Sequence, residues 1–323
     1  MKNFYEINLK SGAHSSLPIA QIDAALRSKT SYVWLDIDHT ASRPEAQKLL
    51  GKVFGFHAWT IKQSFSSGTR PKLEEHENYL FVVVPSLAKT GSGGVEVTNL
   101  SIFLGTNFVV SVHTKPIQAV TDVLKELPKQ DQMLHQASDQ LLYRLLDEVV
   151  DDYRPIIDKL DDEVESVEGA VVNNPVSQTQ AKIFRIKKNV LGLKRSVGPL
   201  REVLNSLTSR QLPFVTARMR LMFRGTYDHT LRTNDELESF RELMSSAMDS
   251  YISQMSNRLN EIMKILSIVA TVMLPLTLIT GIWGTNFRNL PGLTNPAGFW
   301  IMIISMLALT FLMIWFFRWR KWF

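Results

Sequence analysis

Cysteine is absent from the 323 residues of the chain. Its absence excludes disulfide bonds, zinc sites built from thiolates and thiol nucleophiles. The seven histidines are scattered, none belongs to a His-x-x-x-His pair, and no glycine-rich phosphate loop is present. We therefore expect neither an enzyme nor an ATP-driven pump, and we interpret His76 and His229 as structural residues.

Concentrated charge is missing as well. The net charge is only +5, and lysine and arginine are spread along the chain without a basic arm. This distribution gives no reason to expect a nucleic-acid partner. The opening residues, MKNFYEINLKSG, contain no apolar run, so we expect no signal peptide there.

Charged residues are also missing from two long stretches. Residues 265–283 and 297–317 contain 19 and 21 uncharged residues, and at 1.5 Å per residue each spans roughly 28–32 Å, the thickness of a bilayer core. Arg258 and Lys264 precede the first stretch, the sequence RWRKWF follows the second, and such positive residues mark the cytosolic side. We expect a transmembrane hairpin with an outer loop at 284–296, and a basic tail at 318–323. Both termini are then cytosolic.

Strand and helix patterns alternate in the first 120 residues. Three segments rich in valine, phenylalanine, leucine and isoleucine are bounded by glycine, asparagine or proline, which is typical of strands. They cover residues 31–38, 78–87 and 98–114. The segment RPEAQKLLGKVFGF between them has helical periodicity, and KTGSGG at 89–94 indicates a hairpin loop. We expect a cytosolic α/β domain with a mixed sheet over residues 1–120.

Helical patterns dominate from there on, and we expect a helical region over 121–225. Apolar residues recur every three or four positions from Leu142 to Val167, which indicates one helix closed by the sequence VNNP. Ten carboxylates lie within 147–168, and the following stretch is basic. The two stretches are expected to pair as antiparallel helices. The acidic face is either a solvated surface or one that attracts cations near a pore mouth.

No glycine or proline occurs in the 49 residues between Gly225 and Pro275. This segment is long enough for one helix of about 70 Å, formed by a stalk at 226–264 that continues into the first membrane span at 265–283. A helix this long cannot bury its apolar stripe within one small domain. It therefore favours packing against copies of itself.

One face of this helix is acidic or amide-bearing at its cytosolic end and mostly small or apolar beyond. The face contains Asp249, Gln254 or Met255, Asn260, Met263, Ser267, Ala270, Leu274, Thr277 and Gly281. Several copies around an axis would form a narrow, largely hydrophobic pore with occasional polar rings. Small residues also let membrane helices pack closely without a pore. Periodicity alone favours neither interpretation.

The segment NRLNEIMKILSIVATVMLPLTLITGIWGTNF resembles the membrane-entry segment of the CorA family of divalent cation channels. In that family the first span contains a proline at the same place and ends in a Gly-Met-Asn signature followed by phenylalanine. The segments RPKLEEHENYLFVVV, SIFLGTNFVVSV, DDYRPIIDKLDDEVE, VGPLREVLNSL and TYDHT also resemble family segments, in family order.

The resemblance implies a homopentamer in a bacterial inner membrane, with funnel-shaped cytosolic domains on long stalk helices and a pore lined by the first span. Asn286 would form a ring at the outer mouth that holds a hydrated divalent ion through its waters. Gly284 would allow a sharp turn, and Thr285 would complete this selectivity filter. The family pattern places pore-facing groups at Thr277, Leu274, Leu266, Met263, Asn260 and Asp249, with Asp249 a weak metal contact. The transported ion is Mg²⁺, Co²⁺ or Zn²⁺, and no cofactor is expected.

Three departures from the family pattern concern the choice of ion and its regulation. Thr285 replaces the signature methionine. The outer loop has no carboxylate and contains Arg288, a feature that resembles the ZntB branch, which is associated with zinc. Gln63 and Gly225 stand where the family has aspartates that bind Mg²⁺ between subunits and close the channel, and neither residue supplies a charged ligand.

Two functions stay open at this point. The first is divalent cation transport, with Mg²⁺ or Co²⁺ balanced against Zn²⁺. Zinc prefers histidine or thiolate ligands, and the predicted pore face has neither. The alternative is a membrane-anchored oligomeric sensor or scaffold, which would move no ion and would not require Asn286.

Overall fold

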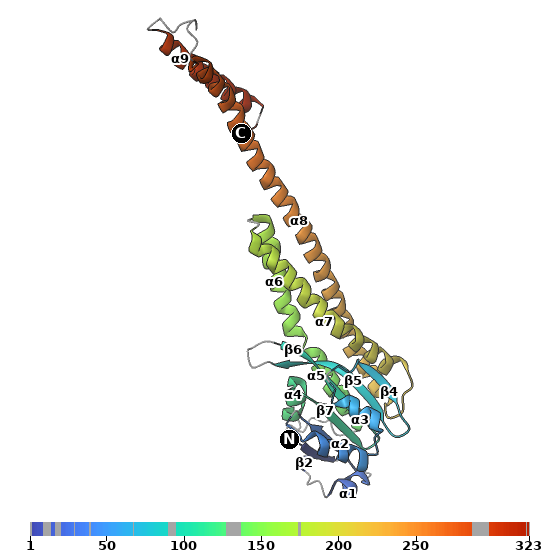
Figure 1. Ribbon diagram of the computed structural model, residues 1–323. Coiled ribbons are helices and arrows are strands. Elements are labelled where there is room, and N and C mark those ends of the chain that lie inside the picture. Colours follow the sequence, from blue (N-terminus) through green and yellow to red (C-terminus); the bar gives the residue numbers. More distant parts are fainter. Residues whose placement is uncertain are drawn as a thin grey trace. The chain divides into compact units, whose positions relative to one another are not determined.

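The secondary structure of the chain is known from a computed structural model (Figure 1). It describes residues 2–8, 14–16, 21–28, 30–38, 40–66, 68–89, 95–126, 137–173, 176–285, 297–320 and 322. Seven strands occur among these residues: β1 (Lys2–Asn8), β2 (His14–Ser16), β3 (Ser31–Ile37), β4 (Lys72–Glu75), β5 (Leu80–Lys89), β6 (Val95–Leu104) and β7 (Phe108–His113). The shorter helices are α1 (Ile22–Leu26), α2 (Arg43–Lys52), α3 (Ala58–Ser64) and α4 (Gln118–Glu126).

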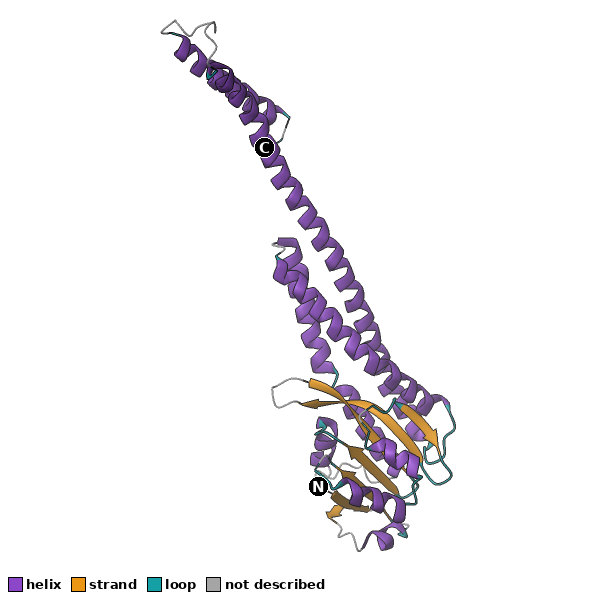
Figure 2. Cartoon of the chain, viewed as in Figure 1, coloured by secondary structure: helices purple, strands orange, loops and turns teal. Residues whose placement is uncertain are grey.

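The described strands form one mixed sheet in the order β2-β1-β3-β7-β6-β5-β4 (Figure 2). β3 and β7 are parallel, and every other neighbouring pair is antiparallel. The predicted mixed sheet is therefore confirmed. The predicted hairpin joins β5 to β6, with Lys89 opposite Val95, and residues 90–94 of its loop lie outside the described residues. The predicted strand segment 98–114 covers most of β6 and all of β7.

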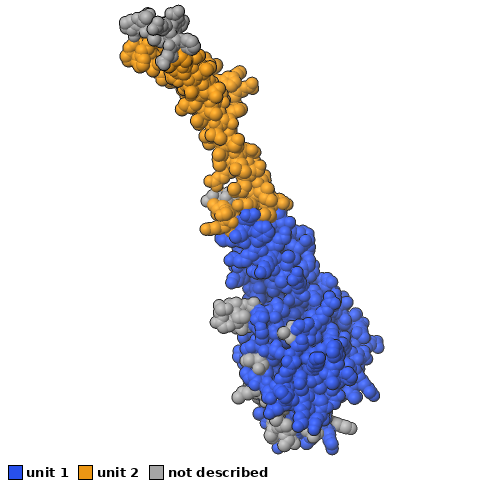
Figure 3. All heavy atoms as spheres, viewed as in Figure 1, with its two compact units in different colours: residues 1–169, 180–246 blue, residues 170–179, 247–323 orange. Residues whose placement is uncertain are grey.

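The chain divides into two compact units (Figure 3). The first contains residues 1–169 and 180–246, and the second contains residues 170–179 and 247–323. The sheet and the helices α1 to α4 belong to the first unit. Most of the residues predicted to contact the ion belong to the second.

One face of the sheet carries the core of the first unit. Alternate residues of its strands point to this face, among them Leu35, Phe81 and Phe103, and all three are fully buried. Phe56, which follows α2, stacks on Phe103 with ring centroids 4.2 Å apart. The apolar residues of α2 and α3 pack into the same cluster, which fixes α3 against the sheet.

Five longer helices follow the sheet: α5 (Ser138–Asp151), α6 (Arg154–Asn173), α7 (Ser177–Ser209), α8 (Ala217–Trp283) and α9 (Gly298–Trp319). The prediction of one helix from Leu142 to Val167 is wrong, because the chain turns at Asp152 and Tyr153 between α5 and α6. Pro155 explains the break. Its ring clashes with the carbonyl group four residues earlier and it has no amide proton to donate, whereas it fits the first turn of a new helix.

The acidic α6 and the basic α7 are consecutive helices that lie side by side in Figure 1. Their apolar residues at helical spacing, such as Leu160 on α6 and Ile186 on α7, are buried. One ion pair within the described residues joins the two helices, between Arg185 and Glu163 at 3.4 Å. The predicted pairing is thus present, with buried apolar residues on both helices and one ion pair between them.

Helix α8 contains 67 residues and combines the predicted stalk and the first span in one element. It begins at Ala217, runs through Gly225 and Pro275, and ends at Trp283. Proline removes one backbone hydrogen bond, a loss that membrane helices tolerate. Among the described helices, α8 and α9 are long and apolar enough to cross a membrane.

Candidate functional site

The predicted pore-facing residues lie on one face of α8. Counting 3.6 residues per turn, all of them fall within an arc of about 120°. Each is exposed in the single chain, and Leu274 has 74% of its surface exposed. These residues are Asp249, Asn260, Met263, Leu266, Ser267, Ala270, Leu274, Thr277 and Gly281. A large apolar side chain this exposed needs cover from lipid or from another chain.

The outer half of this face is hollowed into a shallow groove. Its lining combines small residues, Ala270, Thr277 and Gly281, with larger apolar side chains. Its complete lining is Ala270, Met273, Leu274, Thr277, Leu278, Gly281, Ile282 and Thr285. The groove therefore contains five residues of the predicted pore and filter and no charged side chain.

Hydroxyl groups along this part of α8 donate to the helix backbone. The Thr277 hydroxyl donates to the carbonyl oxygen of Met273 at 2.9 Å, and the Thr271 hydroxyl donates to that of Ser267 at 2.7 Å. Such bonds satisfy the hydroxyl proton where no water is available. The oxygen keeps lone pairs that can accept a hydrogen bond from the water of a hydrated ion.

Thr285, the residue that replaces the signature methionine, closes the end of α8. Its hydroxyl donates to the carbonyl oxygen of Ile282 at 2.6 Å, and its amide is 3.3 Å from the same oxygen. The last carbonyl groups of a helix have no partner within the helix. The threonine side chain supplies such a partner, which a thioether cannot do.

Gly284 forms the turn that follows the helix. Its backbone does not adopt the left-handed conformation that favours glycine, since the positive φ values of the described residues belong to Phe214 and Gly55. A Cβ atom at Gly284 would instead lie 3.0 Å from the carbonyl oxygen of Thr280. Close approach to the backbone thus accounts for this glycine. Asn286 and Arg288 lie outside the described residues.

Gln63, the first of the two predicted sensor positions, lies on α3. Its side-chain oxygen accepts a hydrogen bond from the Lys72 ammonium at 2.5 Å, and that ammonium also contacts Glu74 at 2.5 Å. The oxygen that a metal ion would need is therefore occupied by a cation. A divalent ion would also be repelled by that charge.

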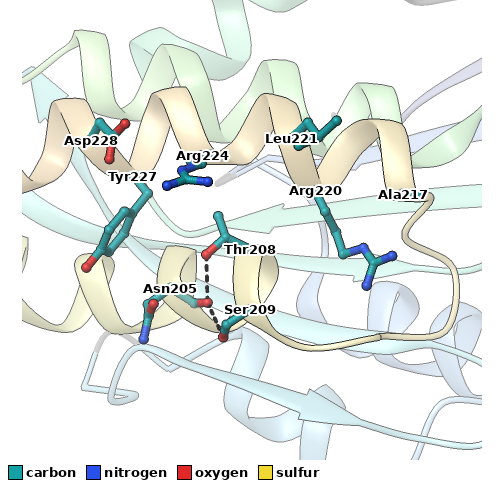
Figure 4. Close-up of a pocket in the computed structure, with 9 residues that line it drawn as sticks. All are labelled: Asn205, Thr208, Ser209, Ala217, Arg220, Leu221, Arg224, Tyr227 and Asp228. Atoms are coloured by element: carbon teal, nitrogen blue, oxygen red, sulfur yellow. Dashed lines mark hydrogen bonds between the residues drawn. The ribbon is translucent and has the colours of Figure 1, made fainter.

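Gly225, the second sensor position, lies on α8 in equally basic surroundings. Figure 4 shows the side chains of Arg220, Arg224 and Tyr227 extending from α8 toward the last turn of α7. Asp228 lines the same pocket. The end of α7 carries a partial negative charge on its carbonyl groups, which the arginine side chains stabilise. No group of three acidic or histidine side chains that could hold a metal occurs among the described residues.

A buried polar network that the sequence analysis missed joins β3 and β7. The Trp34 indole donates to the Ser111 hydroxyl at 3.0 Å, and this hydroxyl donates to Asp36 at 2.6 Å. The Nε2 atom of His113 lies 3.4 Å from the same carboxylate. Burial lowers the pKa of His113, but contacts with Asp36 outweigh it and the pKa is raised above its usual value. The serine proton is directed at the carboxylate and not at the histidine, so the three residues form no nucleophilic triad.

Comparison with known proteins identifies the family. Residues 29–320 match the family described as CorA-like Mg²⁺ transporter protein. The cobalt/magnesium transport protein CorA of Thermotoga maritima is 33% identical over 299 residues, which cover 92% of this chain and 85% of the relative. The solved CorA magnesium transporter of Methanocaldococcus jannaschii matches with a TM-score of 0.86 and 25% identity over 98% of both chains. The zinc transport protein ZntB of Yersinia pseudotuberculosis is 22% identical over 92% of this chain and 90% of its own.

The chain therefore belongs to the CorA-like Mg²⁺ transporter family. It is a membrane protein that transports divalent metal cations and is not an enzyme, and its N-terminal domain is cytosolic. Family membership implies an oligomeric channel that binds metal ions. The predicted CorA-like fold, with an α/β domain, a long helix and two C-terminal membrane spans, is confirmed. The comparisons support transport over the alternative of an anchored scaffold.

Proposed function

We propose that the chain assembles as a homopentamer that conducts hydrated Mg²⁺ or Co²⁺ through a pore lined by α8. The ring of Asn286 side chains forms the outer filter, together with Gly284 and Thr285. Asp249 marks the cytosolic end of the path, where its exposed carboxylate raises the local cation concentration. The five copies of the face from Asn260 to Gly281 surround the path between these two ends.

The groove on α8 is the observation that carries this proposal. The groove coincides with the face selected by periodicity. It contains no charged side chain, and it is exposed in the single chain. The face includes a row of small residues, Ala270, Thr277 and Gly281. Facing an axis, the same row leaves room for an ion with its water shell.

The lining of the path favours an ion that keeps its water. From Asn260 to Gly281 the proposed pore face has no carboxylate, imidazole or thiolate. Mg²⁺ loses water reluctantly, so amide and hydroxyl oxygens suit it because they accept hydrogen bonds from the bound waters. Zn²⁺ prefers imidazole nitrogen and thiolate sulfur ligands, and this face offers neither.

The named substrates of the relatives favour the same ions. The Thermotoga maritima relative, at 33% identity, is a cobalt/magnesium transport protein, whereas the zinc transport protein compared above is 22% identical. The outer loop without a carboxylate and Thr285 nevertheless distinguish the chain from the usual magnesium pattern. Zn²⁺ is therefore the second candidate, and a measurement of ion flux distinguishes it from Mg²⁺ and Co²⁺.

Ion flux into proteoliposomes tests the proposal. Mg²⁺, Co²⁺, Ni²⁺ and Zn²⁺ are offered separately to wild type, to Asn286→Ala and to Asn205→Ala. Asn205 is an exposed asparagine of the cytosolic unit and serves as the matched control. We expect Mg²⁺ and Co²⁺ flux that is lost only in Asn286→Ala. Flux that survives in Asn286→Ala would refute the filter, and a preference for Zn²⁺ would refute the proposed ion.

Native mass spectrometry of the solubilised protein tests the stoichiometry separately. A pentamer has the mass of five chains of 36.8 kDa each. Any other dominant oligomer would refute the fivefold pore while leaving the ion preference to be judged from the flux data.

A further inference from the structure

A second concave surface lies on the first compact unit, and none of its described lining residues belongs to α8. It is formed by the outer face of α3, the segment that follows it and the start of β4, and its volume is about 340 Å³. This size falls within the range of small-molecule sites. The described residues that line it are Trp59, Lys62, Gln63, Ser66, Gly68, Thr69, Arg70 and Lys72.

The surface is positively charged. Three cationic side chains line it, and no carboxylate is among its described lining residues. Glu74 compensates Lys72, whereas Lys62 and Arg70 form no ion pair with any residue that the structure describes. Two positive charges therefore remain for a ligand, and a guanidinium is suited to hold a phosphate group with two parallel hydrogen bonds.

Trp59 adds a flat apolar wall. It is 57% exposed, and it lies three and four residues before Lys62 and Gln63, so the three side chains share one face of α3. An exposed indole ring next to cations is a platform on which an aromatic base can stack. An inorganic anion would gain no stacking contact from the indole ring.

Hydrogen bonds hold this surface in place without a ligand. The Thr69 hydroxyl donates to the carbonyl oxygen of Gln63 at 2.9 Å, and the Asn99 amide donates to that of Thr69 at 2.7 Å. Lys72 links β4 to Gln63. The segment after α3 is thus tied to both α3 and β6, and a preformed site loses less entropy on binding.

We propose that this surface binds a nucleotide, with the base stacked on Trp59 and the phosphates held by Lys62 and Arg70. Gln63 also lines the surface, and its amide is held by Lys72. Because Gln63 stands where the family binds an ion between subunits, a neighbouring copy would border this surface in the proposed pentamer. The proposal does not depend on the ion path through the membrane. It assigns an anionic ligand to a surface whose charge disfavours Mg²⁺.

Titration calorimetry on the full chain in detergent, with EDTA in the buffer, tests this assignment using ATP, tripolyphosphate and adenosine as probes. We expect ATP to bind, and tripolyphosphate and adenosine to bind more weakly. Because stacking of a base on an aromatic ring contributes about 1–3 kcal/mol, Trp59→Ala should weaken ATP binding by about 5-fold to 140-fold. It should leave tripolyphosphate binding unchanged. Trp59→Phe should retain most of the affinity and Trp59→Leu should not.

The charged half of the site is tested by Lys62→Gln and Arg70→Gln. Each should weaken both ATP and tripolyphosphate by roughly 10-fold or more, since each removes a charge-assisted hydrogen bond. Lys52→Gln, an exposed lysine of α2, is the matched control and should change neither. Absence of ATP binding to wild type would overturn the proposal. Equal affinity for ATP and tripolyphosphate, with no effect of Trp59→Leu, would also overturn it, because the site would then recognise only a polyanion.

Discussion

The hydroxyl group of Thr285 donates a hydrogen bond of 2.6 Å to the carbonyl oxygen of Ile282 in the last turn of α8. The side chain that departs from the family signature therefore completes the helix just before Asn286. The hydroxyl proton is used in this bond to the backbone, so only the lone pairs of the oxygen are available to waters at the mouth. A methionine at this position could not make the same bond.

Thr285→Val should lower stability by about 1 kcal/mol, because it removes this bond while keeping the shape of the side chain. Thr285→Ser keeps the hydroxyl and is the matched control. The measurement is the midpoint of thermal unfolding in detergent for all three proteins. A midpoint for Thr285→Val equal to that of wild type would show that the bond contributes nothing there.

Gly284→Ala should destabilise the end of α8, since the added methyl group would lie 3.0 Å from the carbonyl oxygen of Thr280. Relief of that contact requires the turn to shift, which displaces the adjoining filter. We expect a lower unfolding midpoint together with reduced ion flux. Gly192→Ala is the control, because nothing lies within 4 Å of a Cβ atom there. Alanine in that exposed helical position should stabilise by up to about 1 kcal/mol.

The long helix and its face could be predicted from the sequence because both depend on local patterns. The absence of glycine and proline between Gly225 and Pro275 predicts a helix, and spacing of three and four residues selects its face. The predicted stalk begins at residue 226, after Gly225, whereas α8 begins at Ala217 and runs through this glycine. One exposed glycine costs a helix only about 1 kcal/mol. The break between α5 and α6 was missed although Pro155 signals it.

Contacts between distant segments could not be predicted in the same way. Lys72 reaches Gln63 only because β4 lies beside α3, and neither element was expected from the sequence. His113 meets Asp36 because β3 and β7 pair in parallel, with Asp36 opposite Ser111. Parallel pairing joins segments that are far apart along the chain, so no local sequence pattern predicts it.

The buried His113 side chain should make stability depend on pH. Its pKa is raised in the folded chain, so the stabilisation is fully present below the unfolded value of about 6.5 and is lost as pH rises through the folded value. The difference in unfolding midpoint between wild type and His113→Gln should therefore shrink as pH rises above about 6.5. His229→Gln, at an exposed position, is the control. A difference that grows with pH would contradict the contact with Asp36 as the cause.

Restoring acidic residues at the two predicted sensor positions should create a response to Mg²⁺ that we do not expect of wild type. Gly225→Asp can be accommodated, since nothing lies within 4 Å of a Cβ atom at Gly225. Gln63→Asp alone would be neutralised by Lys72, the cation that now contacts Gln63, so we combine both substitutions with Lys72→Gln. We expect Mg²⁺ to protect this triple variant from limited trypsin digestion, because the added carboxylates supply the oxygen ligands that Mg²⁺ requires. Wild type and the variant carrying only Lys72→Gln should show no such protection. Protection of wild type at the same Mg²⁺ concentration would mean that other carboxylates of the assembled channel have taken over the role of these two positions.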